Sequence, residues 1–238
     1  MESKPRPSQP CNALPPHRWP RLRALSDVSQ LNEHLLEVLA EAARSEVPGG
    51  PELLAGNAAL LASMDPGARR YAAQIPIVLM DLNFSDEDWW QSAAHASDDF
   101  KNGGAVFPVP WRWQPEATRE VLMLAWPAVR EDRAAASLMF GMSASVASVM
   151  AALVPRQLDY IGSHFCSEIQ PRWGRAHGFW RRLLSAAIAR NDASLAEIHL
   201  HALQLLGGEM MSVRRQAQET ALHRSGLASR AALSHSRS

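Results

Sequence analysis

Residues 133–161 read RAAASLMFGMSASVASVMAALVPRQLDYI, a run that divides into three short helices. Gly141 can end the first of them in a left-handed conformation, and Ser143 can cap the second, which carries apolar residues along one face. Pro155 stands where the third can begin, because the first helical position needs no backbone N–H. Two core helices joined by a glycine turn produce this pattern, and a helix-turn-helix produces it too.

The rest of the chain also favours helix. Of its 238 residues 47% are hydrophobic and 20% charged, a globular composition in which alanine, leucine and arginine are frequent. We therefore expect an all-α, multi-helix globular protein. Apolar stripes with helical spacing and capping residues predict further helices, over 26–44, from Pro51, from Pro66, from Ser85, over 116–140 with a bend at Pro127, over 179–190 and over 193–223.

The segment 69–84 is the most apolar part of the first half. We expect it to be a buried helix kinked at Pro76. A strand over 75–80 is the alternative, but no partner strand is evident. Asp81 lies in this segment, and burial there requires a partner such as Arg69 or Arg70.

Proline and charge divide the chain. Residues 1–23 contain six prolines and five bases against one acid, and residues 212–238 contain five bases against one acid, which leaves 14 bases and 22 acids between them. An acidic body of this kind disfavours stand-alone binding to nucleic acid. With a loop over 98–115 as the boundary, the predicted units are a disordered Pro-rich tail (1–23), an N-terminal helical lobe (24–100), a second helical domain (116–211) and a disordered basic tail (224–238).

The segment SLMFGMSASVASVMAALVPRQLDYIGSH, residues 137–164, resembles the central part of the FlhD family, subunits of the flagellar transcriptional activator. That family has the same order of a Met-Phe helix end, a glycine turn, a capped helix ending in Ala-Ala-Leu, and then Pro, Gln and an apolar helix. Arg172-Trp173 resembles its aromatic–basic turn, and Ile198-His199 the centre of its last helix. The resemblance covers residues 134–211 and implies dimerisation, an FlhC-type partner and control of flagellar or related genes.

Two features depart from the family. About 130 residues precede the matching region, and the helix expected over 143–153 contains no Lys or Arg. A recognition helix normally carries donors for base edges and phosphates, so DNA contact is expected only indirectly or within a complex. The expected function is a non-enzymatic, homo-oligomeric transcriptional regulator. The alternatives are a helical adaptor or secretion-system chaperone or component without a DNA-linked function, and a small helical enzyme.

The predicted partner-binding surface joins three turns. Two flank the helix after Gly141 and bring polar groups to its ends, and the third has the residue types most enriched at interface anchors. The alternative is that Gly141 only stops a helix and Trp173 belongs to the core. The residues are Gly141, Met142, Ser143, Arg156, Gln157, Arg172 and Trp173.

No catalytic, metal or cofactor site is predicted. His199 and His201 point about 200° apart on a helix and cannot share one ion, and a pair of Glu197 and His201 lacks a third ligand nearby in sequence. No run reaches the roughly 20 apolar residues of a membrane span, and no secretory signal is evident, so a cytoplasmic protein without membrane contact is expected. Its two cysteines are then expected to be reduced, with an intermolecular disulfide through Cys166 as the alternative.

Overall fold

The computed structural model describes residues 22–45, 51–99 and 115–235. These residues form ten helices and one pair of two-residue strands, which confirms the all-α prediction. The helices and strands are α1 (Leu22–Arg44), α2 (Glu52–Ser63), α3 (Pro66–Ala72), β1 (Met80–Asp81), α4 (Glu87–Asp99), α5 (Pro115–Glu131), α6 (Arg133–Phe140), α7 (Ala144–Ala152), α8 (Pro155–His164), β2 (Gln170–Pro171), α9 (His177–Ala189) and α10 (Asp192–His235).

Local signals in the sequence placed several helix ends correctly. Gly141 has φ 61°, the left-handed conformation expected after α6. The Ser143 hydroxyl accepts from the Val146 N–H at 3.2 Å and caps α7. Pro155 begins α8, and Asp65 caps α3 by accepting from the Ala68 N–H at 2.6 Å.

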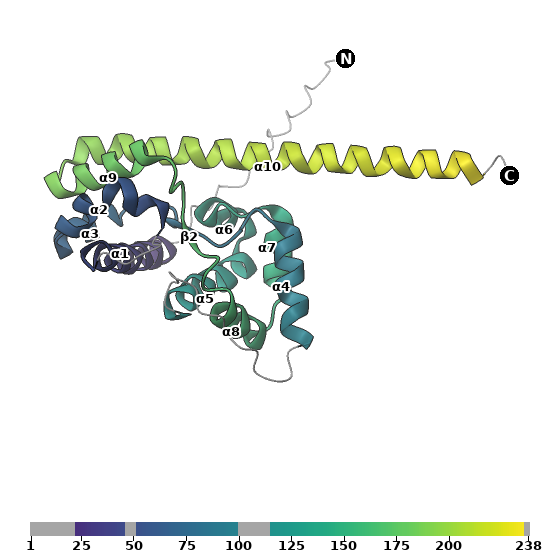
Figure 1. The fold of residues 1–238 in the computed structure, drawn as a ribbon, viewed down its shortest axis with the longest axis horizontal. Helices are drawn as coiled ribbons and strands as arrows, with labels where there is room; N and C mark the ends of the chain where they lie inside the picture. Colours follow the sequence, from purple (N-terminus) through teal and green to yellow (C-terminus); the bar gives the residue numbers. More distant parts are fainter. Residues whose placement is uncertain (1–21, 46–50, 100–114, 236–238) are drawn as a thin grey trace, which may run out of the picture.

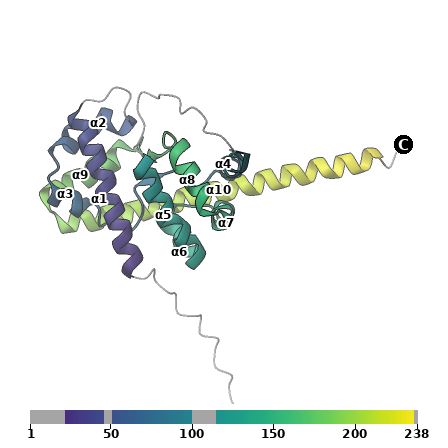
Figure 2. The ribbon, with the colours of Figure 1, turned by 90° about the horizontal axis from the view of Figure 1, so that it is seen from below.

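The helices pack as two groups that do not follow the predicted order of domains (Figures 1 and 2). One group contains α1, α2, α3, α9 and α10, and the other contains α4 to α8. The helix α4 therefore belongs with the second half of the chain, whereas α9 and α10 return to the first. The region that resembles FlhD, residues 134–211, is divided between the two groups. Helix α1 also packs against α5 and links them.

The long helix predicted over 116–140 is wrong, because two helices occupy that range. The break is at Asp132, whose carboxylate accepts from the Ala135 N–H at 3.0 Å and caps α6. Pro127 lies inside α5. The sequence signal was present, since Asp is a preferred capping residue.

The segment 73–84 is not the kinked helix predicted for it. After α3 ends at Ala72 it runs as turns and extended backbone, with only β1 as regular structure. Its predicted place in the core is confirmed: Ile75, Val78 and Phe84 are 1% exposed or less. Of the alternative strand over 75–80 only Met80 lies in a strand, and Met80 pairs with Pro171 of β2, about ninety positions further along the chain.

Side chains and backbone from distant elements satisfy the polar groups of this buried segment. Asn32 on α1 donates to the Ile77 carbonyl at 2.8 Å and accepts from the Leu79 N–H at 2.9 Å. The Val78 N–H donates to the Met139 carbonyl of α6 at 2.8 Å. Buried backbone groups need such partners, so these bonds hold 73–84 between the two groups of helices.

Helix α10 is 44 residues long, about 66 Å at 1.5 Å per residue. Its first part packs on α9, and its C-terminal part extends beyond the body of the molecule (Figure 1). The helix continues to His235 and so includes most of the residues for which a disordered tail was expected, 224–238. The glycines at 207 and 208 do not interrupt it. The predicted tail 1–23 and the predicted loop 98–115 lie almost wholly outside the described residues.

Two residues of the apolar stripes from which α9 and α10 were predicted are exposed. Ile188 on α9 is 39% exposed and Leu203 on α10 is 45% exposed, whereas their neighbours Trp180, Leu184 and Leu206 are buried as expected.

In the described ranges no single helix is long and apolar enough to cross a membrane. Helices α6 and α7 reach that length and composition only as a pair, and the pair is bent by 112°.

A candidate partner-binding surface at Gly141 and Arg172

Arg172 lies at the junction of the two groups of helices, directly after β2. Its backbone N–H donates to the Leu79 carbonyl at 2.8 Å, and its carbonyl accepts from the Trp180 indole N–H at 2.8 Å. Only 3% of its side chain is exposed. A buried arginine is rare unless it is paired, so its partners determine its role.

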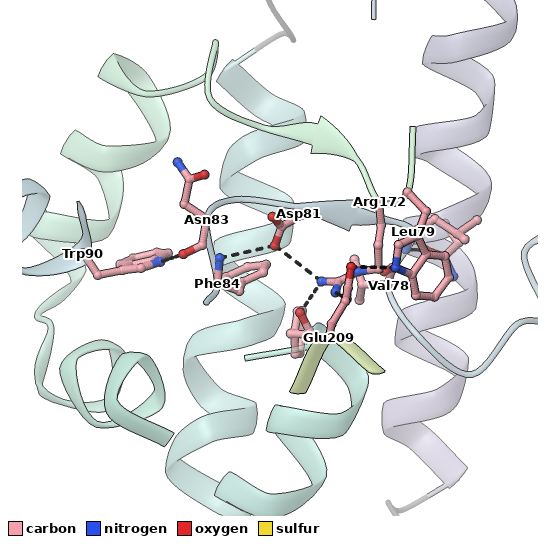
Figure 3. Close-up of polar contacts among 11 residues, drawn as sticks. Val78, Leu79, Asp81, Asn83, Phe84, Trp90, Arg172 and Glu209 are labelled. Carbon is pink, nitrogen blue, oxygen red and sulfur yellow. Dashed lines mark hydrogen bonds and ion pairs between the residues drawn. The ribbon is translucent and has the colours of Figure 1, made fainter. Parts of the chain in front are cut away.

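The guanidinium of Arg172 has four acceptors, and three of the residues that provide them, Val78, Asp81 and Glu209, are labelled in Figure 3. Its Nε donates to the Val78 carbonyl at 3.2 Å, and an Nη donates to the Phe140 carbonyl at the end of α6. The carboxylates of Glu209 on α10 and Asp81 on β1 lie at 3.1 and 3.5 Å. This arginine therefore ties β1, α6 and α10 to β2, and its main role is structural.

Trp173 extends the same junction. Its backbone has φ 55°, an uncommon conformation for a residue other than glycine. Its indole N–H donates to Glu209 at 2.6 Å, and its ring packs edge-on against Phe179 at 4.9 Å between centroids. Glu209 thus accepts from both Arg172 and Trp173 and attaches the middle of α10 to the body.

The Gly141 turn lies directly against Arg172. A Cβ at Gly141 would collide with the Arg172 guanidinium, and a positive φ disfavours any side chain there. Met142 is buried, and the Ser143 N–H donates to the Phe84 carbonyl at 2.9 Å. The turn is therefore part of the core on its inner side and lines the surface on its outer side.

Two adjoining hollows open at this turn, beside α10. The first, of about 500 Å³, is mostly apolar and is lined by Glu87, Ser137, Gly141, Met142, Ser143, Ala144, Ser145, Met210, Val213 and Arg214. The second, of about 440 Å³, is more polar, and Asp81, Arg172, Trp173, Arg175 and Glu209 are among its lining residues. Gly141 and Val213 line both, so the two hollows form one surface, which we call the Gly141 surface.

The structure thus brings five of the seven predicted residues together and leaves two apart. Arg156 and Gln157 lie in the first turn of α8, beyond the far end of α7. Gln157 accepts from the Val154 N–H at 2.9 Å and so helps to cap its own helix. Arg156 is exposed. These two residues do not line either hollow.

Sequence reasoning missed Glu209 and gave Asp81 the wrong partners. Arg69 instead lies 3.3 Å from Glu37, and Arg70 lies 3.3 Å from Glu33. The partner of Asp81 is 91 positions away in sequence, and no local spacing signals a pair of that kind.

The histidines and cysteines of the described part of the chain form no cluster of metal-ligating side chains. No group of three or more His, Cys, Asp and Glu side chains is placed there to hold a metal ion. Burial lowers the pKa of His199 below its ordinary value, which favours the neutral ring. Cys166 is a free thiol and only 2% exposed, which argues against the intermolecular disulfide considered above.

No protein-family model, curated protein or solved structure matches this chain.

Proposed function

We propose that this chain is a non-enzymatic, FlhD-like transcriptional regulator of flagellar or related genes, acting in the cytoplasm through dimerisation and a protein partner of the FlhC type. The observation that carries the proposal is the Gly141 surface, where five residues selected from the sequence meet beside α10. The partner binds in the apolar hollow and makes polar contacts in the second.

The chemistry of the first hollow favours a protein partner. Met210 and Val213 line it beside the buried Met142, and a partly exposed methionine side chain such as that of Met210 adapts to the shape of an apolar partner. Glu87 and Arg214 also line it and provide one charge of each sign. An apolar centre with polar groups around it is the usual composition of a protein interface.

The second hollow offers charges that remain accessible. Asp81 and Glu209 have side chains 36% and 42% exposed, although both face Arg172. Arg175 is 89% exposed and pairs with Glu52 at 3.0 Å. Rim charges of this kind direct association more than they add affinity.

The helix α7 supports action through a partner instead of direct DNA reading. It begins at the Gly141 surface, and its nine residues, ASVASVMAA, include no Lys or Arg. The side chains of a DNA-reading helix must donate to bases and phosphates. The proposal therefore assigns base contacts to the complex.

The test is a mobility-shift assay on flagellar promoter DNA, with and without a co-expressed FlhC-type partner, together with a pull-down. Ser145→Arg places a long side chain in the first hollow, whereas the matched control Ser148→Arg lies on an exposed part of the same helix. We expect Ser145→Arg to lose the partner and the partner-dependent shift without losing helicity, and Ser148→Arg to retain both.

Retention of the partner by Ser145→Arg would contradict the assignment of this surface. Partner binding without any shift of promoter DNA would instead favour an adaptor or a secretion-system chaperone. Arg156→Glu tests separately whether the interface extends to the far end of α7.

A further inference from the structure

The outer face of α10 carries exposed apolar residues, with the exposed Gln204 among them, where the helix lies along the body. Leu200, Leu203 and Met211 are 64%, 45% and 68% exposed, and their spacing of three and eight residues places them on one stripe. Gly207 and Gly208 lie on the same face, between Leu203 and Met211, and are exposed as well. In Figure 1 α10 runs along one side of the molecule.

The two glycines are costly for a helix of this kind. Glycine in a helix interior is about 1 kcal/mol less favourable than alanine. Among the described residues no neighbouring atom explains them, because a Cβ at either position would meet nothing within 4 Å there. Glycine is the usual residue where another backbone approaches closely, and these two leave the outer face of α10 open to a second helix.

Charge along α10 indicates which helix fits. Glu197 precedes the apolar stripe, and Arg215 follows it one turn after Met211. Glu197 is 72% exposed, and its one described ion pair is with Arg182, at 3.4 Å on the exposed surface of α9. The stripe thus has an acid at its N-terminal end and a base at its C-terminal end. In an antiparallel pair of such helices, the acid of each copy lies near the base of the other.

We propose that two copies of this chain pair through the outer faces of their α10 helices, antiparallel and crossing at Gly207 and Gly208. The proposal rests on the dimerisation in the proposed function and assigns its surface. A two-fold axis at the crossing places Leu203 of one copy beside Met211 of the other. It also brings Glu197 of each copy to within about one helical turn of the second copy's Arg215.

The antiparallel arrangement follows from these charges. In a parallel pair each Glu197 would face its own equivalent, and so would each Arg215, and like charges facing each other destabilise an interface. An isologous antiparallel pair makes each contact twice. On α10 the Gly141 surface is lined by Met210, Val213 and Arg214, whereas the stripe consists of Leu200, Leu203 and Met211.

The experiment measures the mass of the full-length protein by light scattering over a range of concentrations. We expect a dimer for the natural protein and a monomer for Gly207→Leu, with dimerisation weakened at least about 100-fold because leucine prevents the close approach. Helicity should stay equal or rise, since leucine is the better helix former. A lower mass together with retained helicity distinguishes loss of the interface from misfolding.

A charge exchange tests the direction of pairing. Glu197→Arg and Arg215→Glu alone should each weaken dimerisation, by about tenfold for two exposed contacts per dimer. The double variant should restore it, because opposite charges face each other again. A monomeric natural protein, a dimer that Gly207→Leu leaves unchanged, or a double variant without rescue would each overturn the proposal.

The same variants distinguish this proposal from the proposed function. A Gly207→Leu monomer that still captures the FlhC-type partner in a pull-down retains the Gly141 surface. Conversely, an intact α10 dimer that captures no such partner contradicts the regulatory function and leaves the dimer assignment standing.

Discussion

Replacing Arg172 with methionine tests whether this side chain holds the two groups of helices together. The change removes the donors to two buried backbone carbonyls, those of Val78 and Phe140, and the cation between Asp81 and Glu209. Methionine keeps most of the aliphatic volume, so the loss of polar contacts dominates.

The magnitude follows from what each acceptor loses. A buried polar group without its partner costs about 1–3 kcal/mol, which gives about 2–6 kcal/mol for the two carbonyls. The two carboxylates are more than a third exposed and add only about 0–1 kcal/mol each, since water replaces the guanidinium. We expect a loss of about 3–5 kcal/mol, the range for breaking a buried ion pair. Native domains have about 5–15 kcal/mol in total.

The assay is urea unfolding followed by tryptophan fluorescence and circular dichroism. Arg175→Met is the matched control, because Arg175 lies three residues away, is 89% exposed and makes one surface ion pair with Glu52. That control should lose about 0–1 kcal/mol. A loss below about 1 kcal/mol for Arg172→Met, or equal losses for the two variants, would refute the assigned role of Arg172.

Four further changes test other parts of the structure. Gly141→Ala should cost about 1–2 kcal/mol for the left-handed backbone and more for the clash with Arg172. A Cβ at Gly178 meets no neighbour, so the control Gly178→Ala should be close to neutral, and urea unfolding of both variants measures the difference. Asn32→Leu leaves buried backbone groups near Ile77 and Leu79 without partners and should lower the urea midpoint by an amount worth about 2–4 kcal/mol. Asp132→Ala removes the α6 cap and should cost about 1 kcal/mol, seen as a lower thermal midpoint. Burial lowers the pKa of His199 in the folded state, so the unfolded state binds the proton more readily. As a result, folding is not opposed by protonation of His199 above the unfolded-state pKa of about 6.5, and the free energy of unfolding decreases as pH falls below that value. His199→Gln should therefore flatten the decline of the urea midpoint between pH 7 and 5.

Local chemistry in the sequence determined where many helices begin and end. The left-handed Gly141, the capping Ser143 and Asp65, and Pro155 at the start of α8 each act within a few residues of their own position. These constraints depend on backbone φ and on hydrogen bonds inside one turn. The same local chemistry identified residues 141–143 as part of a candidate surface.

Only the tertiary structure decided how the segment 73–84 runs. Its composition is as apolar as that of a buried helix, but its backbone partners are Asn32 on α1, Met139 on α6 and Arg172 directly after β2. Contacts over such separations override local preference. The same reason explains why Asp81 pairs with Arg172 and not with an arginine nearby in sequence.

The tertiary structure also decided which apolar residues are buried. Leu203 belongs to the helical pattern of α10 as clearly as Leu206, yet Leu203 is 45% exposed and Leu206 only 1%. Periodicity shows that a helix has apolar residues on its faces, but the packing partner selects the face that is buried. Helix α10 packs against α9 on one side, and that contact leaves Leu200, Leu203 and Met211 on the other.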